Sequence, residues 1–129
     1  MIRVTCAIIQ KEGLILACQR STIMSMPMKW EFPGGKLEEG EDEISCIRRE
    51  IKEELNIEID IIKRLRSFKH DYSNFQIELI PFIAEILSGE IVLKEHQQYA
   101  WLEKKDLPAL DWAAADLPIV EEILLYQFL

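Results

Sequence analysis

A cluster of acidic residues around one arginine is the part of this sequence best suited to chemistry, in the string R-E-I-K-E-E-L. Apolar residues recur at helical spacing through the same segment, at Ile44, Ile47, Ile51 and Leu55. This pattern predicts an amphipathic helix over about residues 42–55. With roughly 100° per residue, Glu50, Glu53 and Glu54 then lie within an arc of about 100° beside the apolar stripe.

Three carboxylates this close repel one another unless a cation lies among them. A hard divalent ion such as Mg²⁺ prefers oxygen ligands and keeps waters and substrate phosphates in its coordination shell. Acidic helix faces are also common as simple solvated surfaces, so the glutamates alone leave both interpretations open.

The whole string over residues 35–57 resembles the Nudix box, G-x5-E-x7-R-E-U-x-E-E-x-G-U, where U is aliphatic. The matching positions are Gly35, Glu41, Arg49, Glu50, Ile51, Glu53, Glu54 and Ile57. One position departs from the pattern, because Asn56 stands where the box has its last glycine. Asparagine is the residue that best tolerates the left-handed conformation after glycine, so we expect little effect on catalysis.

The resemblance extends on both sides of the box and is to the MutT-like branch of the Nudix family. The segment W-E-F-P-G-G-K over residues 30–36 is close to the L-E-F-P-G-G-K of that branch. The resemblance implies an α/β fold, an α/β/α sandwich with a mixed central sheet, in a single domain spanning residues 1–129. It also implies an Mg²⁺-dependent hydrolysis of a nucleoside triphosphate to the monophosphate and pyrophosphate.

The same resemblance assigns roles to the box residues. The Gly35 carbonyl with Glu53 and Glu54 would bind the metal. Glu50 would be a further ligand or the base that deprotonates water, and Arg49 would orient it.

Residues outside the box would complete the site. Glu95 would fill the metal shell or share the role of base, although it could also be an exposed loop residue. Arg20 would meet the phosphates, since its planar fork donates paired hydrogen bonds, and Lys36 would offset developing charge. For each of these two cations a plain surface role is the alternative.

Residues outside the box are expected to recognise the base of the nucleotide. Where 8-oxo-dGTP-hydrolysing relatives have an asparagine, this chain has Asp116, and an ionised carboxylate only accepts hydrogen bonds. Asp116 should therefore prefer an exocyclic amino group, as in cytosine or an adenine-type base, unless it is protonated; a role as helix N-cap is the alternative. Tyr72, Phe75 and Phe32 could face the base or pack in the core. CTP-type substrates are thus slightly favoured over 8-oxo-dGTP.

Composition fits this interpretation. The chain has 129 residues and a net charge of -8, which argues against a nucleic-acid polymer as partner but permits a nucleotide bound with its metal. Three dispersed cysteines suit buried free thiols in a reducing compartment, and neither a signal peptide nor a membrane span is evident, so we expect a cytoplasmic protein.

Several alternatives stay open. The substrate could instead be ADP-ribose, a dinucleoside polyphosphate or a dinucleotide cofactor, although residues 34–80 lack the proline typical of the ADP-ribose type. A non-catalytic nucleotide-binding module is the rival of another class, and the intact acid set argues against it. Sequence decides neither between monomer and homodimer nor between Mg²⁺ and Mn²⁺.

The elements that must position these residues follow from local patterns. Strands are predicted over residues 2–9, 14–18, 30–32, 57–68, 75–87 and 99–102. Loops are predicted over residues 21–29 and 70–74. A last helix over residues 116–128 is expected to turn inward Ile119, Ile123, Leu124 and Phe128.

Overall fold

The computed structural model describes residues 1–125 of the chain. Its strands are β1 (Ile2–Lys11), β2 (Leu14–Gln19), β3 (Trp30–Glu31), β4 (Gly34–Lys36), β5 (Glu58–Arg64), β6 (Phe68–Tyr72), β7 (Phe75–Ser88) and β8 (Gln98–Leu102). Its α-helices are α1 (Glu43–Leu55) and α2 (Leu117–Leu125). Two short 3-10 helices, η1 (Lys104–Ala109) and η2 (Ala114–Asp116), precede α2.

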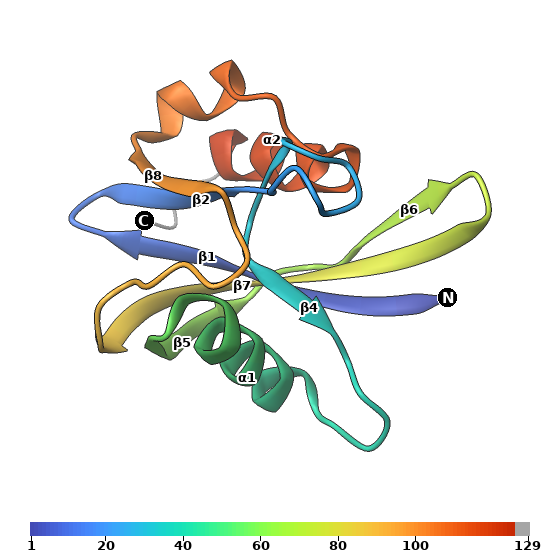
Figure 1. Cartoon of the computed structure of the whole chain (residues 1–129), viewed down its shortest axis with the longest axis horizontal. Helices are drawn as coiled ribbons and strands as arrows, with labels where there is room; N and C mark the ends of the chain where they lie inside the picture. Colours follow the sequence, from blue (N-terminus) through green and yellow to red (C-terminus); the bar gives the residue numbers. More distant parts are fainter. Residues whose placement is uncertain (126–129) are drawn as a thin grey trace.

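The strands form one mixed sheet whose central order is β3-β2-β1-β7-β5. β1 and β7 run parallel, while β1 pairs with both β2 and β4 in the antiparallel sense. β6 adds to β7, and β8 adds to β2. Figure 1 shows α1 on one face of the sheet and α2 on the other.

Alternation along β1 divides the core between these two faces. Cys6 and Ile8 belong to the cluster that includes Ile119 and Ile123 of α2. Ala7 and Ile9 belong to the cluster that includes Ile47 and Ile51 of α1. Because side chains of a strand point alternately to opposite faces, one central strand supports both layers. The predicted α/β/α sandwich with a mixed sheet is confirmed.

Helix α1 begins and ends as its sequence indicates. The Asp42 side chain accepts a hydrogen bond from the Ser45 amide at the N-terminus. Asn56 has φ 62° and ψ 29°, and its amide donates to the Lys52 carbonyl. Asn56 therefore adopts the left-handed conformation that the box glycine would take. Ile44, the first residue of the predicted apolar stripe, is 43% exposed and lies outside the core, whereas Cys46 is completely buried.

The second half of the chain contains the main differences from the predictions. The strand predicted over residues 57–68 ends at Arg64, and the segment predicted as a loop over residues 70–74 is largely strand β6. β6 pairs with β7 up to the pair Tyr72 and Phe75, so only two residues form the turn. The polar residues of β6 suit this position because the hairpin projects beyond the sheet (Figure 1).

Helix α2 begins at Leu117, and Asp116 belongs to the preceding 3-10 turn. Ile119 and Ile123 are buried as predicted, whereas Leu124 is 42% exposed, so its predicted inward position is wrong. Phe128 lies outside the described residues. The three cysteines are buried and unpaired, as predicted. No helix within residues 1–125 is long and apolar enough to span a membrane.

Candidate active site

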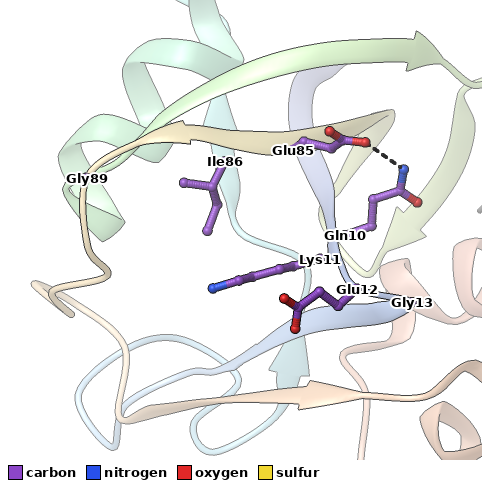
Figure 2. Close-up of a pocket in the computed structure, with 7 residues that line it drawn as sticks. All are labelled: Gln10, Lys11, Glu12, Gly13, Glu85, Ile86 and Gly89. Atoms are coloured by element: carbon purple, nitrogen blue, oxygen red, sulfur yellow. Dashed lines mark hydrogen bonds between the residues drawn. The ribbon is translucent and has the colours of Figure 1, made fainter.

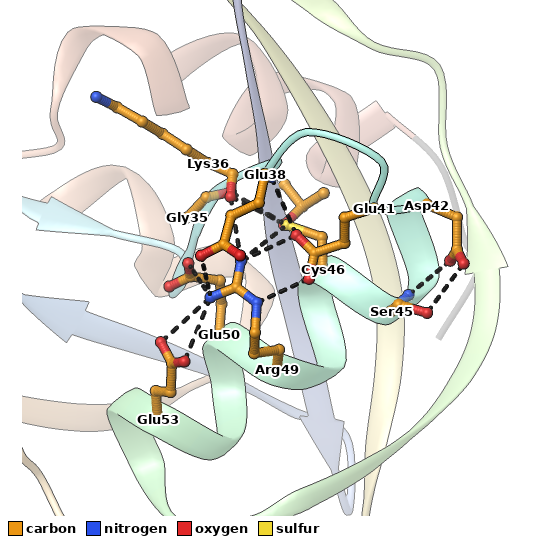
Figure 3. A network of polar contacts seen from close by, with 11 residues as sticks. Gly35, Lys36, Glu38, Glu41, Asp42, Ser45, Cys46, Arg49, Glu50 and Glu53 are labelled. Carbon is orange, nitrogen blue, oxygen red and sulfur yellow. Dashed lines mark hydrogen bonds and ion pairs between the residues drawn. The ribbon is translucent and has the colours of Figure 1, made fainter.

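Arg49 gathers the carboxylates on the outer side of α1. Its Nε and Nη2 atoms donate to the two oxygens of Glu41 at 2.7 and 3.0 Å. Its Nη1 atom lies 2.9 Å from Glu50 and 3.3 Å from Glu53. Figure 3 shows the guanidinium enclosed by these carboxylates. The predicted contact between Arg49 and Glu50 is therefore present, and it is held in place by a paired bond on the opposite side.

Glu41 is the member of this network that the sequence did not explain. The hydrogen bond from Arg49 lowers the pKa of the Glu41 carboxyl from 4.5 to about 2, with help from the Glu38 backbone. Glu41 thus stays ionised and keeps the guanidinium oriented toward Glu50 and Glu53. Glu41 is one of the specified positions of the Nudix box, eight residues before Arg49, and this is the feature of the sequence that could have predicted the contact.

Glu54 lies on the inner side of α1 and is only 6% exposed. Its Oε1 atom accepts the Gly34 N–H at 3.0 Å, which ties the helix to β4. Burial, together with the charges of Glu31, Glu95 and Glu50, raises the pKa of the Glu54 carboxyl to about 9. Several acids therefore act on one another here with too little positive charge among them.

Glu50 occupies the space between Arg49 and the turn at Gly35. Burial raises the pKa of the Glu50 carboxyl, Arg49 opposes that effect, and the charges of Glu53 and Glu95 add to it. A Cβ atom on Gly35 would lie 2.3 Å from the Glu50 carboxyl carbon. The absence of a side chain at residue 35 is therefore what admits this carboxylate.

Glu95 reaches the same region from the loop that precedes β8. The Lys94 amide donates to the Glu54 carbonyl at 3.2 Å, and the Gln97 amide donates to the Gln19 carbonyl at 2.8 Å. These two bonds fix the loop between the end of α1 and the end of β2. The fold thus brings Glu95 close enough to affect the pKa of both Glu50 and Glu54.

This donor set suits a hard divalent cation, because every candidate ligand is an oxygen and the acids outnumber nearby cations. Within residues 1–125, however, no three His, Cys, Asp or Glu side chains converge as a ready-made metal site. The hydrogen bonds explain this: Glu50 and Glu53 face Arg49, whereas Glu54 faces the Gly34 amide. Arg49 engages only one oxygen of Glu50, whereas both oxygens of Glu53 face the guanidinium, so Glu53 would have to turn away to bind a metal.

The Gly35 carbonyl, predicted as a metal ligand, has other partners. It lies 3.2 Å from the Thr5 hydroxyl and 3.6 Å from the Cys46 thiol, and both donors are completely buried. The carbonyl therefore faces the interior between β1 and α1. Its role as a ligand stays a prediction, and it would have to share or exchange these partners.

A cavity of about 240 Å³ adjoins the buried end of the acid cluster. Eight of the residues predicted from sequence line it, namely Arg20, Phe32, Gly35, Lys36, Glu54, Tyr72, Phe75 and Asp116. Glu54 marks one part of this cavity and Asp116 another. Two predicted metal ligands, Gly35 and Glu54, therefore share one hollow with the predicted base-reading residues, whereas Glu50, Glu53 and Glu95 are not among its lining residues.

The two predicted phosphate-binding cations differ in their surroundings. Arg20 is engaged, since it donates to Glu31 at 2.7 Å and through two bonds to the backbone and side chain of Ser25. Lys36 lines the cavity and extends away from the Arg49 network in Figure 3. Lys36 is thus placed to meet an entering anion, whereas Arg20 must first give up part of its present contacts.

Two of the three aromatic candidates, Tyr72 and Phe75, form an aromatic wall of the cavity, whereas Phe32 belongs to the core. The Tyr72 and Phe75 rings lie 5.1 Å apart on the β6–β7 hairpin, and Phe75 is 45% exposed. Phe32 is 3% exposed and packs 4.8 Å from the ring of Trp112. Tyr72 and Phe75 can therefore face a ligand, while Phe32 mainly supports the cavity from the core.

Asp116 is buried beneath this wall. Within residues 1–125 its carboxylate accepts the Phe32 N–H at 2.9 Å, not an amide from the first turn of α2. The alternative of a helix cap is therefore wrong. Burial raises the pKa of the Asp116 carboxyl well above its usual range, and the charge of Glu31 adds to this. Asp116 is a group set into the cavity wall.

A second hollow, of about 460 Å³, lies beside the turn between β1 and β2. Figure 2 shows that Lys11, Glu12 and Glu85 give it mixed charge. None of the residues predicted to do chemistry lines it. The hollow at Glu54 and Asp116 is therefore the candidate active site.

Residues 1–123 match the family model of the NUDIX domain, and the chain belongs to the Nudix hydrolase family. It is 32% identical over 124 residues to the CTP pyrophosphohydrolase of Escherichia coli strain K12, covering 96% of this chain and 92% of that relative. The 8-oxo-dGTP diphosphatase of the same strain is 29% identical over 84% of each chain.

Solved structures show the same fold. The solution structure of the E. coli ORF135 protein has a TM-score of 0.84 at 31% identity, covering 97% of this chain and 89% of that one. MutT from methicillin-resistant Staphylococcus aureus 252 has a TM-score of 0.77 at 36% identity, covering 96% and 95%. The prediction of a MutT-like Nudix hydrolase is confirmed, and with it the prediction of an enzyme.

Gly35→Ala tests the space reserved for Glu50. The new methyl group displaces a flexible carboxylate, so the fold should persist while turnover falls at least about tenfold through misplacement of a catalytic group. Steady-state hydrolysis and thermal unfolding measure the two effects. Gly40→Ala is the control: it places a Cβ in open space at φ +79°, which should cost about 1 kcal/mol of stability and leave turnover unchanged. Equal turnover in both variants would contradict the placement of Glu50.

The pairing of Glu41 with Arg49 predicts a pH dependence of stability. Because the pKa of the folded state is lowered to about 2, the pair stabilises the fold above the ordinary value of 4.5 and loses this effect as pH falls toward 2. Glu41→Gln should lower the urea midpoint at neutral pH and flatten its decline over that acidic range. Glu39→Gln, an exposed neighbour, should follow the parent curve. Parallel declines for Glu41→Gln and the parent would refute the assignment.

Proposed function

We propose that this enzyme hydrolyses a nucleoside triphosphate to the monophosphate and pyrophosphate with Mg²⁺, favouring a cytidine-type base. The observation that carries the proposal is the single cavity of about 240 Å³ lined by both Glu54 and Asp116. Glu54 belongs to the acid cluster of α1, and Asp116 lies below the aromatic wall. A nucleotide bound in this cavity would have its phosphates near the acids and its base near Asp116.

The metal site would consist of Glu50, Glu53, Glu54 and Glu95, with the Gly35 carbonyl as the fifth predicted ligand. A bound divalent ion would lower the pKa of water, orient it and stabilise charge on phosphate oxygens. Mg²⁺ is the proposed ion, and Mn²⁺ is the alternative with the same preference for oxygen.

The side chains divide the remaining work. Glu50 and Glu95 are the two candidates for accepting the proton of the attacking water, since both belong to the acid cluster. Arg49 holds Glu50 by a hydrogen bond of 2.9 Å, which limits its rotation. Lys36 and Arg20 line the cavity and would attract the phosphates.

The proposed base preference rests on Asp116. As a carboxylate it offers only acceptors, and one oxygen already accepts the Phe32 N–H. The other oxygen would accept from an exocyclic amino group, as cytosine has, while Tyr72 and Phe75 would contact the ring face. The relative named CTP pyrophosphohydrolase, which matches 96% of this chain, supports this preference.

A second candidate substrate, 8-oxo-dGTP, is favoured by the raised pKa of Asp116. A protonated carboxyl donates as well as accepts, so it could match a purine edge that carries both a carbonyl and an N–H. The relatives named 8-oxo-dGTP diphosphatase agree with this candidate. The two substrates differ in the protonation state that they require of one residue.

The cellular setting belongs to the same proposal. We infer that residues 1–129 act as one Nudix domain in the cytoplasm, as a monomer or homodimer, on free nucleotides and not on nucleic-acid polymers. The net charge of -8 and the three buried free thiols support this setting.

A pyrophosphate-release screen tests the proposed function. The triphosphate substrates are CTP, dCTP, 5-methyl-dCTP, 8-oxo-dGTP and 2-hydroxy-dATP, each with and without Mg²⁺. ADP-ribose is tested alongside them by release of AMP, because its hydrolysis gives AMP and ribose 5-phosphate and no pyrophosphate. We expect pyrophosphate release to depend on the metal and to be fastest with cytidine nucleotides. Release that needs no metal, or turnover of ADP-ribose alone, would overturn the proposal.

Glu50→Gln and Glu53→Gln test the acid cluster. Each change keeps the side-chain shape but removes a charge, so each should reduce turnover by at least about a hundredfold with the fold intact. Initial rates and thermal unfolding provide the readouts. Glu39→Gln, an exposed glutamate just before the box helix, is the matched control and should hydrolyse at the parent rate. Near-full activity of both folded site variants would remove these residues from the site.

Asp116→Asn tests the reading of the base. The amide oxygen can still accept the Phe32 N–H, so the variant presents a donor to the cavity without losing its support. We expect the ratio of kcat/KM for CTP over 8-oxo-dGTP to fall by at least about tenfold. Asp111→Asn, at an exposed aspartate paired with Lys29, should leave the ratio unchanged. An unaltered ratio in Asp116→Asn would exclude Asp116 from recognition.

A further inference from the structure

His96 follows Glu95 directly but points the opposite way, into the protein. Its side chain has no exposed surface, whereas Glu95 is exposed. The His96 Nε2 atom lies 2.8 Å from a carboxylate oxygen of Glu31. Its Nδ1 atom is buried and makes no hydrogen bond within residues 1–125. A single polar contact therefore orients this ring.

The tautomer follows from the contact. Because Nε2 faces a carboxylate oxygen, which only accepts, the ring proton belongs on Nε2. The unpartnered Nδ1 atom is then left as an acceptor and not as an unpaired donor. His96 is thus a hydrogen-bond donor to Glu31.

Glu31 shares its two oxygens between His96 and Arg20. Its Oε1 atom accepts from Arg20 Nη1 at 2.7 Å, and its Oε2 atom meets His96. The Glu31 side chain is only 14% exposed, so both bonds lie largely out of water. Three separate segments meet here: the end of β2, strand β3 and the loop before β8.

The backbone on either side of His96 is tied to the acid cluster. The Lys94 amide donates to the carbonyl of Glu54, and the Gln97 amide donates to the carbonyl of Gln19. Glu95 and His96 are the two residues between these anchored amides. With the His96 ring held inward by Glu31, the Glu95 side chain is exposed and lies close enough to Glu50 and Glu54 to raise the pKa of both.

We propose that His96 is a positioning residue for the hydrolysis, because its bond to Glu31 fixes Glu95 in the acid cluster and aligns Arg20 at the cavity. This inference rests on the proposed function and adds a group that does not touch substrate or metal. His96 would influence the metal site by positioning Glu95. It would influence binding of the substrate phosphates because Glu31, its hydrogen-bond partner, also holds Arg20. The loss of a residue that orients ligands in this way typically lowers metal affinity or activity by about 10- to 100-fold.

Two substitutions separate the hydrogen bond from the space that the ring fills. His96→Leu keeps most of the buried volume and removes the donor, whereas His96→Gln carries an amide N–H at about the reach of Nε2. Gln97→Ala is the control on the same loop, because its side chain is exposed and only its backbone is used. Thermal unfolding of each variant reports whether the fold is retained.

The first readout does not depend on turnover. The dissociation constant of Mn²⁺ from the substrate-free protein is measured by electron paramagnetic resonance of the free ion. His96→Leu should raise it by about tenfold, while His96→Gln should stay within about threefold of the parent. Gln97→Ala should match the parent.

The second readout is steady-state hydrolysis of CTP with Mg²⁺. We expect kcat of His96→Leu to fall by about tenfold and the half-activating Mg²⁺ concentration to rise, with recovery in His96→Gln. A merely structural histidine would change the unfolding temperature without changing the Mn²⁺ dissociation constant. Parent-like Mn²⁺ binding and kcat in folded His96→Leu would overturn the inference, as would a folded His96→Gln with at least a tenfold loss of both.

The two readouts distinguish failure of the proposed function from failure of the inference about His96. If the parent releases no pyrophosphate from any triphosphate, the function is wrong, but the Mn²⁺ measurement still tests His96. If the parent hydrolyses CTP and the His96 variants bind Mn²⁺ and turn over as it does, only the inference about His96 is wrong.

Discussion

The placement of several carboxylates in one poorly solvated region is the constraint on which the rest of this structure depends. Burial and mutual repulsion raise the pKa of Glu54 to about 9 and shift that of Asp116 in the same direction. Such a cluster persists only if its charges are offset, by protons, by internal cations or by an ion supplied with substrate. Arg49 and Arg20 supply the internal cations from opposite sides, since Arg49 engages Glu41 and Arg20 engages Glu31.

The sheet explains how these groups come together. β1 supports a core on each face, so α1 can be pressed against one side while the residues before α2 close the other. The Gly34–Lys36 strand crosses between the two and gives its Gly34 amide to Glu54. A Cβ on Gly34 would lie 2.0 Å from the Thr5 carbonyl oxygen, so the contact of β4 with β1 requires glycine. The packing of β4 against β1 therefore also places the Gly34 amide where it holds Glu54 in the acid cluster.

The sequence alone predicted the parts that depend on local pattern. The box helix, its Asn56 terminus and the β1–β2 hairpin follow from short-range spacing, and the family resemblance led to the sandwich. Strand β6 was missed because its alternating polar residues read as a turn when the pairing partner β7 is unknown. The carboxylate partner of Arg20 lies 11 residues away, and the partners of Asp116 and His96 lie 84 and 65 residues away, so no local pattern could have indicated them. Asp116 is the clearest example: aspartate is a favourable N-cap residue, but here its carboxylate accepts the Phe32 amide and not an amide of α2.

The bonds that hold Asp116 and Glu54 have one more consequence. Asp116 accepts the amide of Phe32, and Glu54 accepts the amide of Gly34, two residues further along the same segment. An extended chain advances about 3.3 Å per residue. Because the chain bends at Pro33, the two amides lie within that extended limit of about 7 Å of each other. In the proposed site, the separation between the end that holds the base and the end that holds the phosphates is thereby limited by covalent geometry. An inserted or deleted residue in this tripeptide would change the length of nucleotide that fits, even with every functional side chain retained.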